Sequence, residues 1–109
     1  MRQRLPNRRM AETFDIEVAG LKYTVTVGRF PDGRLSECFI GNHKSNSAAD
    51  VNARDGGILL SLCLQHGCEA ETIARALCRN SDGTASGVIG AVLDKIAELD
   101  KVVDLGGKR

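Results

Sequence analysis

The strongest constraint on the fold is a change in the spacing of apolar residues about midway along the chain. From Thr13 to Ala19 apolar and polar residues alternate strictly, and the alternation resumes from Lys22 to Val27. A period of two is typical of half-buried β-strands. After Gly41 the apolar residues recur at helical spacing instead. Strands followed by helices predict an α+β fold.

Short connections predict how the strands pair. Ala19-Gly20 forms a turn, and Pro31 to Arg34 forms another, since proline fixes φ and glycine accepts a positive φ. A third strand is expected from Leu35 to Ile40. Two short connections in succession predict a three-stranded antiparallel meander in the N-terminal half. One face should be wet or serve as an assembly surface; it carries Asp15, Glu17, Lys22, Thr24 and Thr26.

The second half predicts two to three helices that cover one face of the sheet. The first begins near Ala48, but Gly56-Gly57 interrupts it, so its first turns are expected to be a separate short helix or loop. A second helix fits Glu69 to Arg79, and a third runs from a Ser86 cap to about Val103. The expected inward stripe of the first helix is Ala48, Val51, Leu59, Leu62 and Cys63. That of the third is Ile89, Val92, Leu93, Ile96 and Leu99.

The length of 109 residues predicts one domain, from residue 11 to 104, between a leader and a frayed tail at 105–109. The leader at 1–10 is basic and carries Arg2, Arg4, Arg8 and Arg9. It is either a solvated, flexible segment or an arm that docks on phosphate or an acidic partner. The net charge of +1 and the scarcity of aromatic residues argue against nucleic-acid binding, except through this arm.

No apolar run is long enough to span a membrane, and no signal peptide is present. The chain contains four cysteines. Without a secretory signal they are expected to be free thiols in a reducing compartment, which predicts a cytoplasmic protein.

Motifs for catalysis are missing, and no catalytic residue and no cofactor are predicted. Cys63 and His66 stand three residues apart, which allows a thiol and an imidazole to meet on one helix face. A structural role is the alternative, because Cys63 and Cys78 are expected on apolar helix faces. The cluster of Cys63, His66, Cys68 and Cys78 has ligand types that suit zinc. Its spacing lacks paired C-x2-C motifs, so no metal is expected.

The loop between the last strand and the first helix is the candidate phosphate or ligand site. Free amide groups and the positive end of a helix dipole attract anions, and the loop adds small residues and a lysine. Arg54, about two turns into the helix, is close enough in sequence to reach back. The alternative is an ordinary polar helix cap. The candidate residues are Gly41, Asn42, Lys44, Ser45, Ser47 and Arg54.

The order of several short motifs resembles one known family. The motifs are Leu5-Pro6-Asn7-Arg8-Arg9, Tyr23 to Gly28, Asp32-Gly33-Arg34, Glu37-Cys38-Phe39-Ile40, Lys44-Ser45 and Leu64-Gln65-His66-Gly67. Together they are similar to the TSCPD domain, found at the C-terminal end of vitamin-B12-dependent ribonucleotide reductases and as short free-standing bacterial and phage proteins. The resemblance covers roughly Leu5 to Leu99. The Thr-Ser-Cys-Pro-Asp signature is replaced by Thr84 to Val88, so a thiol or metal role of the signature does not carry over.

The resemblance implies a cytoplasmic role in deoxynucleotide metabolism and DNA replication, without ribonucleotide reduction by this chain alone. The hypothesis is therefore a non-catalytic accessory module that binds a nucleotide or a ribonucleotide reductase subunit. Three alternatives stay open: a stand-alone nucleotide-binding or sequestering protein, an assembly module that forms homo-oligomers, and a thiol enzyme built on Cys63 and His66.

Overall fold

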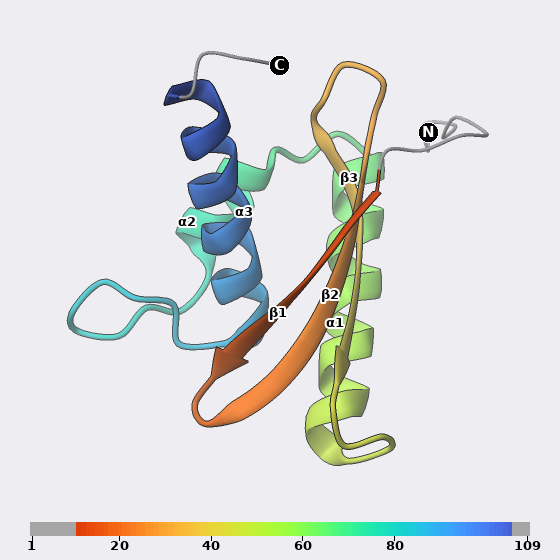
Figure 1. The fold of residues 1–109 in the computed structure, drawn as a ribbon, viewed down its shortest axis with the longest axis vertical. Coiled ribbons are helices and arrows are strands. Elements are labelled where there is room, and N and C mark those ends of the chain that lie inside the picture. The colour runs from red at the N-terminus through yellow and green to blue at the C-terminus, as the bar shows by residue number, and fades with distance from the viewer. Residues whose placement is uncertain (1–10, 106–109) are drawn as a thin grey trace.

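The computed structural model of the chain describes residues 11–105, and its elements follow the predicted order (Figure 1). The strands are β1 (Ala11–Val18), β2 (Leu21–Arg29) and β3 (Leu35–Asn42). The helices are α1 (Ala48–Gln65), α2 (Ala70–Ala76) and α3 (Val88–Leu105). The predicted α+β class is therefore confirmed.

The three strands form one antiparallel sheet in the order β1-β2-β3, as predicted. The β1–β2 hairpin turns through Ala19 and Gly20, whose φ angles are 54° and 80°. Positive φ at both central residues suits the right-handed twist of the flanking strands. Val18 pairs with Leu21 directly beside this turn, which fixes the register of the whole hairpin.

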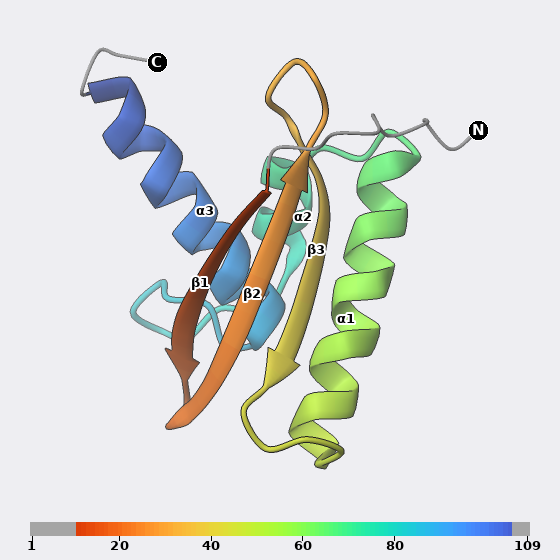
Figure 2. The ribbon, with the colours of Figure 1, turned by 45° about the vertical axis from the view of Figure 1, so that its right-hand side comes forward.

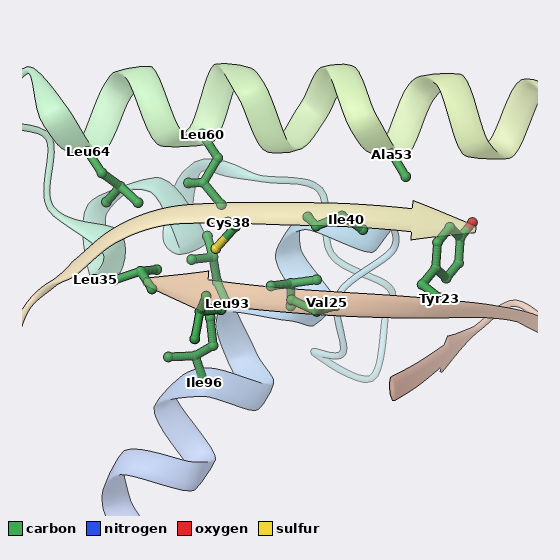
Figure 3. Packing of buried hydrophobic residues seen from close by; sticks show 12 residues of the cluster. Tyr23, Val25, Leu35, Cys38, Ile40, Ala53, Leu60, Leu64, Leu93 and Ile96 are labelled. Carbon is green, nitrogen blue, oxygen red and sulfur yellow. The ribbon is translucent and has the colours of Figure 1, made fainter. Parts of the chain in front are cut away.

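One face of the sheet and two helices enclose an aliphatic core. Figure 3 shows Leu60 and Leu64 of α1 and Leu93 and Ile96 of α3 pointing toward the strands from two sides. Val92 of α3 is fully buried in the same cluster. The strands contribute Tyr23, Val25, Val27, Leu35, Cys38 and Ile40. The opposite face of the sheet is open, and the polar residues predicted for it are exposed or half-buried there.

Helix α1 lies along the outer edge of β3 (Figure 2). A Cβ atom on Gly57 would lie 3.0 Å from the carbonyl oxygen of Cys38, so this glycine allows the helix to approach the strand backbone. The Ser61 hydroxyl accepts a hydrogen bond from the amide of Cys38 at 2.9 Å and donates to its carbonyl at 3.2 Å. Gln65 donates to the carbonyl of Ser36 at 3.0 Å. Side chains of α1 therefore satisfy backbone groups that β3 presents at its edge.

This docking overturns two predictions about the first helix. Gly56-Gly57 does not interrupt it, because α1 is continuous from Ala48 to Gln65. The expected inward stripe is also wrong: Ala48, Val51, Leu59, Leu62 and Cys63 are all exposed. The buried residues are instead Asp50, Ala53, Gly57, Leu60, Leu64 and Gln65. A helix that binds a strand edge buries hydrogen-bonding residues and a glycine there, so its inward face is not its most apolar one.

The other helices differ from prediction mainly at their ends. Helix α2 stops at Ala76, three residues before the expected Arg79, because Leu77 adopts an extended conformation with ψ of 161°. Helix α3 begins at Val88, and the Ser86 hydroxyl donates to the side chain of Asn80 instead of capping it. The predicted inward stripe of α3 is buried or half-buried as expected. None of the described helices combines the length and hydropathy needed to cross a bilayer.

Candidate functional site

The predicted ligand loop lies between β3 and the start of α1, and its amide groups converge on a side chain. The carboxylate of Asp50 accepts hydrogen bonds from the amides of Asn42 at 3.0 Å and Asn46 at 2.9 Å. The Ser47 hydroxyl caps the helix by accepting from the amide of Asp50 at 3.1 Å. Asn46 adopts a φ of 62°, which directs its amide inward. The loop therefore binds an anion that belongs to the chain itself.

The electrostatics of Asp50 agree with this arrangement. The amides of Asn46 and Asn42 hold the pKa of the Asp50 carboxyl below its ordinary value, and the nearby charge of Arg54 lowers this pKa further. The Nε atom of Arg54 lies 3.4 Å from the carboxylate, so this arginine does reach back to the loop. A phosphate would compete with Asp50 for the same amides. The exposed side chains of Lys44 and Ser45 are the parts of the predicted site that face outward.

A small polar cluster extends from this loop onto the open face of the sheet. The hydroxyl of Thr24 donates to Asp15 at 2.9 Å, and the Nε2 atom of His43 lies 3.1 Å from the same hydroxyl. Because Thr24 has one hydroxyl hydrogen and directs it at Asp15, His43 must act as the donor in its contact. His43 is therefore not placed as a base for Thr24, and the cluster does not have the geometry of an activated nucleophile.

The predicted cysteine and histidine cluster does not form a site. The Nδ1 atom of His66 is hydrogen-bonded to the carbonyl of Leu62 at 2.9 Å, and no hydrogen bond joins the side chains of His66 and Cys63 within the described residues. Cys63 and Cys78 are both exposed. Cys63 lies on the outward face of α1 with the exposed Leu59 and Leu62, so its helix face is apolar but not buried, whereas Cys78 lies beyond the end of α2 and on no helix face. Across residues 11–105 no three potential ligands come together at one point.

Cys38 is the buried thiol of the chain. Burial, together with a smaller effect of the adjacent Glu37 carboxylate, raises the pKa of the Cys38 thiol to about 12. Such a thiol stays protonated and behaves as a small apolar side chain. The basic leader residues Arg2, Arg4, Arg8 and Arg9 lie outside the described residues.

The structure also reveals a groove that sequence reasoning missed. It has a volume of about 810 Å³ and lies between the β2–β3 turn, α2 and α3. Its floor includes the core residues Leu64, Leu93 and Ile96. Its rim carries four arginines that lie far apart in the sequence, and we call it the arginine groove. They are Arg29, Arg34, Arg75 and Arg79.

Each rim arginine of the arginine groove is held in place by an acid. Arg29 pairs with Asp100 of α3 at 2.9 Å, and its side chain is only 13% exposed. Arg79 pairs with Asp94 through both terminal nitrogens, one of them at 3.0 Å. The groove therefore presents two ordered guanidinium groups, those of Arg29 and Arg79, and two more exposed ones beside apolar residues, a combination suited to recognition of a partner surface rather than to bond chemistry. The first and last rim arginines are fifty positions apart in the sequence, so they come together only in the folded chain.

Comparison with known proteins finds similarity to part of a much larger enzyme. The chain is 39% identical over 75 residues to a vitamin B12-dependent ribonucleotide reductase of Agrobacterium fabrum, covering 69% of the chain and 6% of that protein. The reductase of Bradyrhizobium diazoefficiens is 38% identical over 66 residues, covering 61% and 5%. That of Rhodopirellula baltica is 36% identical over 72 residues, covering 66% and 7%.

The chain thus spans only 5–7% of the length of these relatives. It is similar to a short region of the reductases. No protein-family model and no solved structure matches the chain.

Proposed function

We propose that the chain is a non-catalytic accessory module of ribonucleotide reduction, which acts by binding a vitamin B12-dependent reductase in the cytoplasm. The similarity to a short region of three such reductases is the observation that carries this proposal. The order of its motifs further favours membership of the TSCPD domain family. A module of this kind acts through recognition, which requires a stable fold and a partner surface rather than an active site.

The described geometry supports a binding role. The Thr24, His43 and Asp15 cluster lacks the orientation of a nucleophile and base, and the Cys63 and His66 side chains are not paired with each other. The arginine groove, by contrast, combines buried apolar residues with ordered guanidinium groups. Arginine next to apolar surface is enriched where protein partners meet. We therefore assign the arginine groove as the main surface for the reductase.

A nucleotide at the loop from Gly41 to Ser47 is the second candidate. Lys44 and Ser45 are exposed there and offer a positive charge and a hydroxyl to a phosphate. This proposal requires the phosphate to bind beside the Asp50 carboxylate or to displace it from the amides of Asn42 and Asn46. Binding of this kind should be weak, because the internal carboxylate has no translational entropy to lose.

A reconstitution experiment tests the accessory role. The reductase of Agrobacterium fabrum is prepared intact and with the region that matches this chain removed, and deoxynucleotide formation is measured with and without the chain. The proposal predicts that the chain binds the trimmed enzyme and restores part of its turnover, while the chain alone produces no deoxynucleotide. Deoxynucleotide formation by the chain alone, or a failure to bind either form of the enzyme, would show that the proposal is wrong.

Two charge reversals on exposed side chains identify the surface used. Arg75 lies on the rim of the arginine groove with 71% of its side chain exposed, and Lys44 lies on the loop. Arg75→Glu should weaken binding to the trimmed reductase, whereas Lys44→Glu should not. Both side chains are exposed, so neither change should alter the fold, and unchanged melting temperatures serve as the control. The reverse pattern would move the contact surface to the loop.

A further inference from the structure

The two edges of the sheet are treated in opposite ways. On β3, side chains of α1 bind the backbone groups that face outward, as Ser61 does at Cys38. On β1, which forms the other edge, no described residue plays this role. An edge strand with unpaired backbone groups is a template for pairing with a further strand.

The hydrogen-bond pattern identifies which groups of β1 are open. The even-numbered residues of β2 face β3, as the bond from the amide of His43 to the carbonyl of Lys22 at 3.0 Å illustrates. The odd-numbered residues of β2 therefore face β1, where Tyr23 pairs with Ile16 and Val25 with Phe14. Alternation then directs the amides and carbonyls of Thr13, Asp15 and Glu17 away from the sheet. Among residues 11–105 none of these groups has a hydrogen-bond partner.

A groove of about 650 Å³ lies directly beside this open edge. One wall is the end of β1 from Asp15 to Val18, and the other is α3, which contributes Ala91, Asp94 and Glu98. Figure 2 shows β1 at the border of the sheet with α3 crossing behind it. A groove between a strand edge and a helix is the shape that accepts an extended peptide, because main-chain bonds form on one side and side chains pack on the other.

The acidic side chains at the groove indicate that a positively charged segment binds there. Asp15, Glu17, Asp94, Lys95 and Glu98 line it, but Asp94 is paired with Arg79 and Glu98 with Lys95, so Asp15 and Glu17 carry its uncompensated negative charge. Glu17 has no ion-pair partner among the described residues, so its charge is available to a ligand. A second copy is a poor occupant, because antiparallel pairing of two β1 strands would bring their acids together, and like charges across a strand pair are destabilising.

We propose that β1 binds an extended, arginine- or lysine-rich segment of another polypeptide, which adds to the sheet as a fourth strand in the groove between β1 and α3. The backbone of this segment pairs with Thr13, Asp15 and Glu17. Its alternate side chains project beside Asp15 and Glu17 on the open face, where positive charges are stabilised. This inference follows from the edge geometry and the acidic residues beside it, and holds whether or not the chain serves a ribonucleotide reductase.

Peptide titration of the whole chain tests the inference. The probe is a ten-residue peptide in which arginine alternates with threonine, and amide signals are followed by NMR. We expect shifts along β1, slower hydrogen exchange at the amides of Thr13, Asp15 and Glu17, and weaker binding at higher salt. The matched control is the same peptide with alternate backbone nitrogens methylated, which keeps the charge but removes the donors. Equal binding of both peptides, or shifts confined to the arginine groove, would overturn the proposal.

Variants of one residue separate the two components of the interaction. Glu17→Lys should weaken binding about five- to tenfold, because an exposed attraction becomes a repulsion. Glu17→Pro removes one outward amide without breaking a bond to β2, since proline is tolerated on an edge strand, and it should also weaken binding. Unaltered affinity in both variants would contradict the proposal. A concentration-dependent dimer that forms through β1 in sedimentation experiments would contradict the choice of occupant.

Discussion

The hydroxyl of Ser61 provides a direct test of how α1 is held on the sheet. Ser61→Ala should destabilise the fold by about 2 kcal/mol, because it leaves a buried amide and carbonyl without hydrogen-bond partners. The loss of a partner for a buried polar group costs about 1–3 kcal/mol of stability. Both groups belong to Cys38, which is 1% exposed, so solvent has little access to them when the hydroxyl is removed. Alanine favours a helix slightly over serine, so the measured loss is net of a gain of about 0.5 kcal/mol.

Ser36 offers a matched control with the same chemical change. It lies on β3 close to Cys38 and is fully buried, yet its hydroxyl has no hydrogen-bond partner among the described residues. Alanine there removes a polar atom that is desolvated without compensation. We therefore expect Ser36→Ala to leave the free energy of unfolding unchanged or to raise it by about 1 kcal/mol. The carbonyl of Ser36, which accepts from Gln65, is retained in this variant.

Urea unfolding followed by far-ultraviolet circular dichroism compares the two variants. With a slope of about 1–3 kcal/mol/M for a protein of this size, the Ser61→Ala midpoint should fall by roughly 1 M. The slope itself should not change. Equal midpoints for Ser61→Ala and the original chain would refute the role assigned to the hydroxyl. A larger loss in Ser36→Ala would refute the reasoning about satisfied and unsatisfied groups.

Three further predictions concern the loop and the thiols. Asp50 has a lowered pKa in the folded chain, so its contribution to stability is present above its ordinary pKa of 3.8 and is lost as the pH falls through the lowered value. Asp50→Asn should flatten the acid limb of a stability curve measured by urea unfolding between about pH 2 and pH 5; an identical limb would contradict this. Lys44→Ala should weaken any nucleotide binding by about 1–3 kcal/mol with little change in melting temperature, as checked by calorimetric titration; unchanged affinity would exclude the loop. A disulfide reagent should react at once with the exposed thiols of Cys63, Cys68 and Cys78. Cys38 should stay unmodified until denaturant is added, because this thiol is buried and its pKa is about 12. Modification of all four thiols in the folded chain would contradict the burial of Cys38.

The strands could be predicted from the sequence because their signal is local. Alternation from Thr13 to Val27 depends on one buried and one open face, and the Ala19-Gly20 turn fixes the register. The inward face of α3 was predictable for the same reason, since it packs on apolar side chains. In both cases the residues that repeat are the residues that are buried, so periodicity and burial carry the same information.

Helix α1 could not be predicted in this way, because its neighbour is a strand edge rather than an apolar face. Gly57 reads as a helix breaker by propensity, yet the close approach to Cys38 requires it. Asp50 and Gln65 read as outward-facing by polarity, yet both are buried and bind backbone groups. The β3 backbone groups that bind Asp50 and Gln65 lie 8 and 29 positions away in the sequence, a separation that no local pattern contains.

The candidate site was predicted in part for a related reason. The loop from Gly41 to Ser47 does direct amides at an anion, and Arg54 does reach back, as the sequence indicated. The anion is Asp50, three residues inside the helix, whose charge could as well have faced solvent. The arginine groove was missed because its rim is assembled from β2, the β2–β3 turn, α2 and the segment after it.

The buried polar residues that made the inward face of α1 hard to predict also determine where a further strand can be added to the sheet. Ser61 and Gln65 use the backbone groups of β3 that a new strand would need, so addition at that edge would first require α1 to leave. The edge of β1 has no such competitor among the described residues, and a strand can pair there without loss of an existing bond. Weakening α1 with Ser61→Ala should therefore lower stability but leave binding of the basic peptide unchanged. If that variant bound the peptide more tightly, the β3 edge would be the binding edge, and the argument from the open groups of β1 would be wrong.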